Sequence, residues 1–115
     1  QRLVRKICPS CRMDVEINGE TALKLTGGKE EKLLLHRGEG CNLCNRTGYR
    51  GREAVNEVLV IDDDIRSLIL KNATEIELTA KAREKGMPTL EENAIQKVLK
   101  GITTFEEMYR VVANF

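Results

Sequence analysis

The sequence has no tryptophan and only two tyrosines and two phenylalanines among its 115 residues. With so few aromatic side chains, the core must depend on leucine, isoleucine, valine and alanine, which favours helices and disfavours an all-β fold. The length suits one domain or two small modules that share a core, and 41% hydrophobic residues is enough to fold. We therefore expect an α+β fold that is mainly α.

Long hydrophobic runs are also missing. No apolar stretch approaches the roughly 20 residues needed to span a bilayer, and no signal sequence opens the chain. We expect a cytoplasmic protein without direct membrane insertion. The chain starts at Gln1 without a methionine, in what reads as an ongoing element, which predicts that it belongs to a longer polypeptide.

The sequence lacks the motifs of nucleotide binding and covalent catalysis. It has no GxxxxGK[ST] loop that could wrap a triphosphate. A single histidine, His36, gives no specific Ser/His/acid set. We predict no catalytic and no cofactor-binding residues, so that this chain alone is not an enzyme.

The net charge of +1 hides an asymmetry between the two halves of the chain. Residues 1–52 carry 11 Lys/Arg and 6 Asp/Glu, whereas residues 53–115 carry 8 and 12. This split suggests two modules that face each other or a basic face offered to a partner, although two ordinarily solvated surfaces would give the same count. It argues against a charge footprint for DNA over the whole surface.

The four cysteines fall into two CxxC pairs, Cys8 with Cys11 and Cys41 with Cys44, separated by 29 residues. Each CxxC turn places two sulfurs on one side of a tight knuckle, so two knuckles supply a complete tetrahedral shell for Zn²⁺. Because four thiolates leave no position for water, the predicted site is structural. The nearby basic residues Arg5, Lys6, Arg12 and Arg46 could offset the thiolate charge.

Other interpretations of these residues remain open. The cysteines could form disulfides, which a reducing cytosol disfavours, or a thioredoxin-like dithiol, which needs only one pair. His36 could replace one thiolate. The triplet Asp62, Asp63 and Asp64 could bind magnesium, but acids directly before an amphipathic helix more often cap it.

After the second knuckle, Glu53–Ile61 is rich in β-branched residues and predicts a strand, and the segments 20–25 and 32–37 predict short elements. Four short helices follow, with starts at Asp62, Thr74, Thr89 and Thr104. Their apolar stripes, the last of which runs from Phe105 to Ala113, predict that the helices pack together. We therefore expect a tetracysteine zinc module with its exit strand at 1–61 and a helical segment at 62–115.

Four stretches resemble one protein family: QRLVRKICPSC, GCNLCNRTGYRGREAVNEVLVID, GMPTL and KVLKGITTFEEMYRVV. In their order they resemble the C-terminal region of the type II secretion and type IV pilus assembly ATPases (GspE/PilB-like). The chain departs from the family at Arg52–Glu57, which leaves the pilus and secretion subfamilies both open.

The resemblance implies a non-catalytic zinc-binding module of a hexameric ATPase, with the metal on Cys8, Cys11, Cys41 and Cys44. ATP and Mg²⁺ would bind in the parent protein, before the segment that matches Gln1. The implied partners are the rest of the parent ATPase, neighbouring subunits of a homohexamer and inner-membrane platform proteins, at the cytoplasmic face of the bacterial inner membrane.

Two other functions compete with this interpretation. In a nucleic-acid-binding zinc ribbon, Arg46, Arg50 and Arg52 would contact phosphates and Tyr49 would stack on a base. A chaperone-type zinc module would need repeated CxxCxGxG units, which neither pair forms. The resemblance predicts no nucleic-acid partner.

Overall fold

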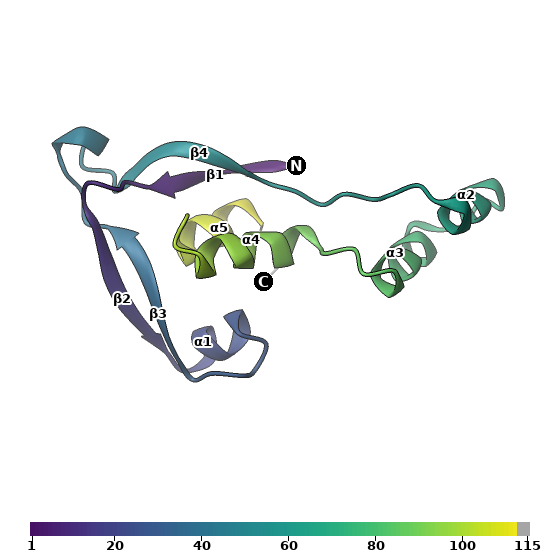
Figure 1. Ribbon diagram of the computed structural model, residues 1–115, viewed down its shortest axis with the longest axis horizontal. Helices are drawn as coiled ribbons and strands as arrows, with labels where there is room; N and C mark the ends of the chain where they lie inside the picture. Colours follow the sequence, from purple (N-terminus) through teal and green to yellow (C-terminus); the bar gives the residue numbers. More distant parts are fainter. Residues whose placement is uncertain (113–115) are drawn as a thin grey trace.

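The computed structural model describes residues 1–112 (Figure 1). Within this range, five α-helices and two separate two-stranded antiparallel sheets form an α+β fold, as predicted. In chain order the elements are β1 (Arg2–Ile7), β2 (Arg12–Asn18), α1 (Glu20–Leu25), β3 (Lys32–Gly38), the 3-10 helix η1 (Asn42–Cys44), β4 (Tyr49–Val55), α2 (Asp63–Leu70), α3 (Glu75–Glu84), α4 (Leu90–Leu99) and α5 (Phe105–Val111).

Each sheet has one of its ends at the cysteine turns. β1 pairs with β4, with Val4 opposite Glu53, and β2 pairs with β3, with Val15 opposite Leu35. The first CxxC turn connects β1 to β2 and the second connects β3 to β4. The two ribbons therefore meet at the cysteines and diverge from there (Figure 1).

The helices α4 and α5 lie between the diverging ribbons (Figure 1) and form the core with them. The buried cluster takes residues from both ribbons and from α1, α4 and α5: Val4, Leu25, Leu35, Val55, Ala94, Val98, Met108 and Val112. This core therefore combines side chains from both sides of Asp62.

The predicted helix starts are confirmed by capping bonds. Asp62, Thr74, Thr89 and Thr104 each accept a hydrogen bond from the backbone N–H three residues later, on Ile65, Glu77, Glu92 and Glu107 respectively. These bonds satisfy N–H groups that a helix cannot satisfy internally. The segments 20–25 and 32–37 are also ordered elements, a helix and a strand.

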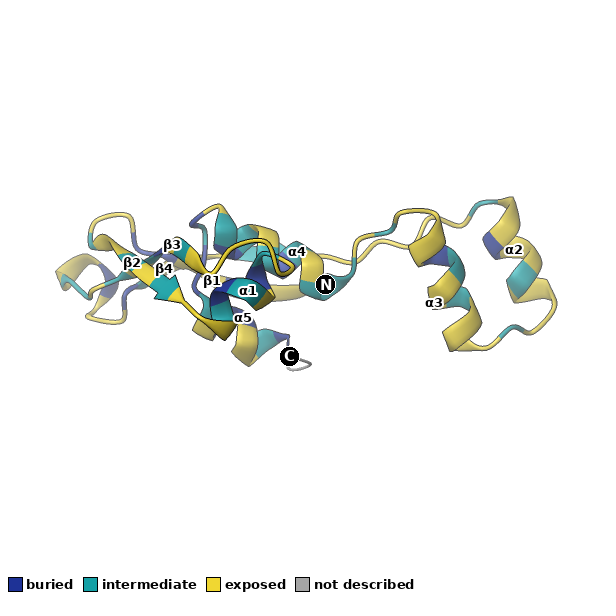
Figure 2. Cartoon of the chain, turned by 90° about the horizontal axis from the view of Figure 1, so that it is seen from below, coloured by how far each residue is buried: buried dark blue, intermediate teal, exposed yellow. Residues whose placement is uncertain are grey.

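The four C-terminal helices do not form one packed set, which corrects the prediction. α2 packs on α3 and α4 packs on α5, and the first pair stands apart along the 55 Å long axis (Figures 1 and 2). α3 is mostly polar and buries only Ala82, so it offers no apolar stripe to α4. The stretch 87–89, which contains Pro88 and forms no helix or strand, separates the pairs.

The predicted exit strand is correct only in part. β4 begins at Tyr49, earlier than predicted, and its pairing ends at Val55, opposite Arg2. Residues 56–62 form no strand within the described chain, because no neighbouring strand lies beside them.

The last predicted stripe is partly buried. Met108 and Val112 belong to the core, Tyr109 is 52% exposed, and Ala113 lies outside the described residues. Among residues 1–112, no helix has both the length and the apolar composition needed to cross a bilayer.

Candidate metal centre

The structure brings together the four cysteines that the sequence singles out. Cys8 and Cys44 are buried, while Cys11 and Cys41 are partly exposed. The first pair lies in the turn between β1 and β2, whereas in the second pair Cys41 caps η1 and Cys44 is its last residue. After Cys44 the chain reverses through left-handed backbone at Asn45 and Arg46, with φ of 55° and 66°.

The four sulfurs have the spacing of a tetrahedral metal shell. All four Sγ atoms lie within 4.8 Å of one another. Cys8 to Cys41 and Cys11 to Cys44 measure 3.8 Å, and Cys41 to Cys44 measures 3.7 Å. A tetrahedron with metal–sulfur bonds of about 2.3 Å has edges of about 3.8 Å. The cluster is therefore compatible with one bound metal ion.

Backbone N–H groups point at the sulfurs. Gly40 donates to Cys11 Sγ at 3.3 Å, and Cys41 and Gly48 both donate to Cys44 Sγ at 3.2 Å. Such bonds stabilise thiolates and orient metal ligands from outside the coordination shell. The loops thus supply part of the charge compensation that the sequence analysis assigned to arginine and lysine side chains.

The pKa values of the thiols differ with these surroundings. Burial raises the pKa of Cys44, but the N–H groups of Cys41 and Gly48 lower it more, to about 6. Gly40 lowers the pKa of Cys11, but burial and the neighbouring cysteines raise it to about 11. A cation among the sulfurs would favour the thiolate form at all four positions.

Two glycines let the second knuckle pack directly on the end of β3. A Cβ atom on Gly38 would lie 2.1 Å from the carbonyl oxygen of Gly48, and one on Gly48 would lie 2.5 Å from the carbonyl oxygen of Gly38. Gly48 also has a φ of 82°. The same region is held by the N–H of Cys8, which donates to the Gly48 carbonyl at 2.9 Å.

A polar network missed by the sequence analysis connects the knuckle strands to α5. The Arg5 guanidinium lies 4.2 Å from the Tyr49 ring centre and bonds to Glu107 at 3.1 Å. The Tyr49 hydroxyl is 2.6 Å from Thr104 Oγ1. Arg5 thus pairs with a carboxylate and an aromatic ring. The sequence offered no signal for this network, because its members lie far apart along the chain.

The other candidate ligands have different partners. His36 Nδ1 lies 2.9 Å from Asp14 Oδ1, and among the described residues His36 is not part of a metal-ligand group. Asp62 caps α2 and pairs with Lys85, which also lies 2.7 Å from Asp64. The aspartate triplet therefore serves a helix start and ion pairs in this structure.

Comparison with known proteins identifies a family. The type II/IV secretion system protein family matches residues 1–110. The type IV pilus assembly ATPase PilB of Thermus thermophilus is 44% identical over 110 residues, which cover 94% of this chain and 12% of that protein. The type II secretion system protein E of Dickeya dadantii is 43% identical over 111 residues, 96% of this chain and 22% of that protein.

A further relative, the type II secretion system ATPase E of Vibrio cholerae, is 39% identical over 111 residues, with the same two shares of 96% and 22%. The chain thus spans less than a quarter of the length of these curated relatives. Both pilus and secretion proteins appear among them at similar identity, so the comparisons do not separate the two subfamilies.

Proposed function

The chain belongs to the type II/IV secretion system protein family, and we propose that it is a non-catalytic, zinc-binding module of a secretion or pilus assembly ATPase. The observation that carries this proposal is the group of four cysteine sulfurs within 4.8 Å of one another. Zinc suits a closed shell of four thiolates, and such a shell leaves no coordination position for a substrate or a reactive water.

The role of the site would be to clamp the two β-ribbons at their common end. Each CxxC turn joins a strand of one ribbon to a strand of the other, so one ion on Cys8, Cys11, Cys41 and Cys44 fixes both connections. α4 and α5 pack between the ribbons, and the clamp therefore also supports the core. Burial alone gives a small module little stability, and a structural metal adds to it.

We place the module at the C-terminal end of a parent that carries ATP and Mg²⁺ on motifs before Gln1. In this proposal the parent is a homohexamer at the cytoplasmic face of the inner membrane, which powers protein transport or pilus assembly. The module braces the ATPase core and contacts a neighbouring subunit or an inner-membrane platform protein. A rigid clamp of this kind can pass motion of the core to a partner.

Metal analysis tests the central claim. The purified chain should hold one zinc per molecule, and a chelator should release the zinc and with it the protection of β1–β4 amides against hydrogen exchange. Metal-free protein that is fully folded would overturn the zinc assignment. In the parent, replacing all four cysteines by serine should reduce secretion or pilus output, and unchanged output would remove the mechanical role.

The alternative of a nucleic-acid-binding zinc ribbon has less support. Its one stacking residue, Tyr49, lies under the Arg5 guanidinium and bonds to Thr104 through its hydroxyl. Titration of labelled single strands at low salt distinguishes the two functions, because binding to phosphates weakens steeply with salt. Salt-sensitive binding would favour the ribbon, and no binding at low salt would remove it.

A further inference from the structure

Residues Glu57–Ile61 form no helix or strand, and they run without a strand partner to a tight turn at Ile61, where the Val60 carbonyl accepts a hydrogen bond from the Asp62 N–H at 3.1 Å. They continue the direction of β4 beyond Val55, where its pairing with β1 ends (Figure 1). In the described part of the chain, no hydrogen bond involves the backbone N–H of any of these five residues. We call this segment the unpaired strand.

The unpaired strand is apolar on both faces. Val58 and Val60 are 66% and 71% exposed, and Leu59 and Ile61 are 40% and 49% exposed. Successive side chains of an extended chain point to opposite faces, so Val58 and Val60 lie on one face and Leu59 on the other. A continuous run of such residues is typical of a strand inside a sheet that is covered on both sides.

The surrounding arm, residues 56–89, has almost no core of its own. Only Ile65 and Ala82 are buried in it, and most of its surface is exposed (Figure 2). The arm therefore leaves most of its apolar side chains available to a partner surface.

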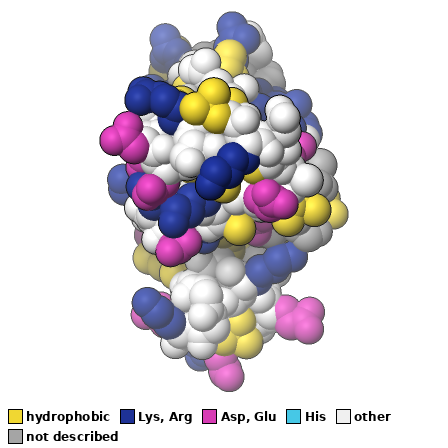
Figure 3. All heavy atoms as spheres, turned by 90° about the vertical axis from the view of Figure 1, so that its right-hand side faces the viewer, with side chains coloured by type: hydrophobic (Ala, Val, Ile, Leu, Met, Phe, Trp, Pro, Cys, Tyr) yellow, Lys and Arg dark blue, Asp and Glu magenta, His cyan; other side chains and the backbone are white. Residues whose placement is uncertain are grey.

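Further apolar side chains at the end of the arm are left uncovered. Ile69 and Leu70 of α2 and Ile76 of α3 are 47%, 77% and 81% exposed. From that end of the molecule, hydrophobic side chains reach the surface between charged ones (Figure 3). The mixture of apolar contacts and charges suits a protein surface as the partner.

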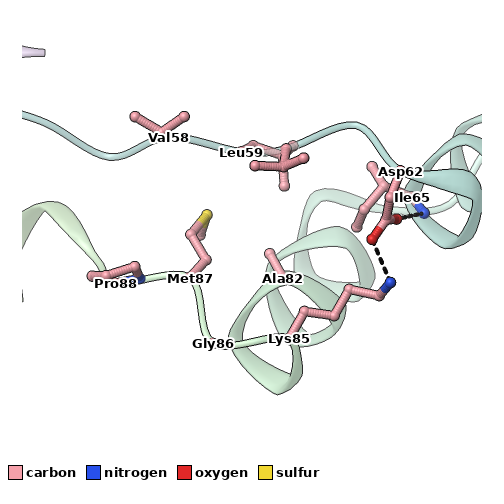
Figure 4. Close-up of a pocket in the computed structure, with 10 residues that line it drawn as sticks. Val58, Leu59, Asp62, Ile65, Ala82, Lys85, Gly86, Met87 and Pro88 are labelled. Carbon is pink, nitrogen blue, oxygen red and sulfur yellow. Dashed lines mark hydrogen bonds and ion pairs between the residues drawn. The ribbon is translucent and has the colours of Figure 1, made fainter.

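A groove of about 310 Å³ separates the unpaired strand from the opposite side of the arm (Figure 4). Val58, Leu59 and Val60 line one side, and Ala82, Met87 and Pro88 line the other. Lys85 bonds to Asp62 across the end of the groove. The close-up shows Leu59 turned towards Ala82 and Met87 and Val58 turned away from them, so the Leu59 face of the strand is partly sheltered, while the N–H groups of Glu57–Ile61 have no acceptor among the described residues.

We propose that the unpaired strand adds to a β-sheet in the ATPase portion of the parent, and that the arm then packs on that portion. This inference rests on the proposed function, because it requires a parent protein. The matched relatives have most of their length outside the region shared with this chain, which covers 12% and 22% of the first two. A strand edge there would supply the missing backbone partners.

A second copy of this chain fits less well as the partner. Two unpaired strands side by side would make a two-stranded ribbon whose faces are both apolar and still exposed. Each copy would also keep one edge without partners. A larger sheet with packed layers would cover both faces and both edges, and our proposal assigns that sheet to the parent.

Hydrogen exchange tests the proposal without any substitution. In the parent, the amides of Glu57–Ile61 should exchange at least about 100-fold more slowly than in the 115-residue chain alone, because only the parent supplies acceptors. Fast exchange in both proteins would overturn the proposal. Slow exchange in the chain alone, with a dimer in sedimentation, would assign the strand to a second copy and overturn it as well.

A test variant and a control variant show whether the slow exchange depends on the unpaired strand. Val60→Asp in the parent should restore fast exchange at Glu57–Ile61, because a carboxylate cannot be buried there without a partner. Leu34→Asp is the matched control, since Leu34 is 58% exposed on β3 and outside the arm, and it should keep the slow exchange. Equal effects of both substitutions would contradict the proposal.

Zinc content, measured on the same samples, separates this inference from the proposed function. The cysteine cluster lies at the opposite end of the molecule from α2 and α3 (Figure 1), so Val60→Asp should leave one zinc per chain. Protection of Glu57–Ile61 in a zinc-free parent would sink the zinc assignment and leave the strand proposal standing. One zinc per chain with fast exchange at Glu57–Ile61 would overturn the strand proposal and leave the zinc assignment standing.

Discussion

Arg5 and Glu107 join the first strand to the last helix through both the main chain and the side chain of Arg5. The Arg5 N–H donates to Glu107 Oε2 at 2.7 Å, and its guanidinium donates to Oε1 at 3.1 Å. Arg110 adds two bonds of 2.8 Å to the same carboxylate. Glu107 is only 1% exposed, so its charge depends on these donors.

Glu107→Gln should destabilise the fold. The amide keeps the shape of the side chain but loses the charge, and one of its ends donates where the carboxylate accepted. We expect a loss of about 2 to 3 kcal/mol in the free energy of unfolding, measured in urea. Glu106→Gln is the control, because Glu106 is exposed on the same turn, and it should change the stability by less than about 0.5 kcal/mol.

The Glu107 carboxylate also predicts a pH dependence. Bonds from the Arg110 side chain, opposed by burial and assisted by Arg5, lower the pKa of Glu107 from 4.5 to about 2. Because the folded pKa is lowered, the stabilisation is fully present above pH 4.5 and is lost as the pH falls through 2. Its full size is on the order of 3 kcal/mol.

Thermal unfolding of the wild type and of Glu107→Gln, each measured from pH 6 to pH 2, checks this dependence. Comparison at each pH cancels the loss of metal in acid, which both proteins share. The difference between their midpoints should shrink steadily below pH 4.5. A difference that stays constant down to pH 2 would show that the carboxylate charge contributes nothing.

Local signals made the helices predictable. Each start at Asp62, Thr74, Thr89 and Thr104 depends on a side chain and an N–H three residues away, so the sequence contains the whole interaction. The cysteine cluster was predictable for a related reason, since each CxxC fixes half of a shell and only one further pair could complete it.

Distant partners made the rest unpredictable. The composition of Val58–Ile61 predicted a strand. Pairing, however, depends on a neighbouring strand that the segment itself does not encode, and the chain alone leaves the segment unpaired. Glu107 lies three residues after the Thr104 cap, but its side chain takes a bond from the Arg5 N–H, 102 positions away. The separation of α2 and α3 from α4 likewise follows from what each helix buries, which tertiary packing decides.

Substitutions in and near the cysteine cluster should distinguish zinc ligands from residues that only lie nearby in the sequence. Cys11→Ser should lower bound zinc from one per chain towards none in the presence of a competing chelator, because a serine hydroxyl is a poor ligand for zinc. His36→Ala should retain the zinc, since the group of possible metal ligands among the described residues contains the four cysteines and not His36. Loss of zinc in both variants, with the fold of His36→Ala intact by circular dichroism, would place the histidine among the ligands.

Gly48→Ala tests the close backbone approach beside the cluster, and Gly28→Ala is its matched control. Both glycines have left-handed backbone, with φ of 82° and 86°, so alanine costs about 1 to 2 kcal/mol at either position. At Gly28 the new Cβ would meet nothing within 4 Å, whereas at Gly48 it would lie 2.5 Å from the Gly38 carbonyl oxygen.

The clash at Gly48 can be relieved only by moving the second knuckle away from β3, and the Gly48 N–H then moves away from Cys44 Sγ. We therefore expect Gly48→Ala to cost clearly more stability than Gly28→Ala and to weaken zinc binding by about tenfold or more, measured by chelator competition. Equal stability and equal zinc affinity of the two variants would show that the knuckle does not need this contact.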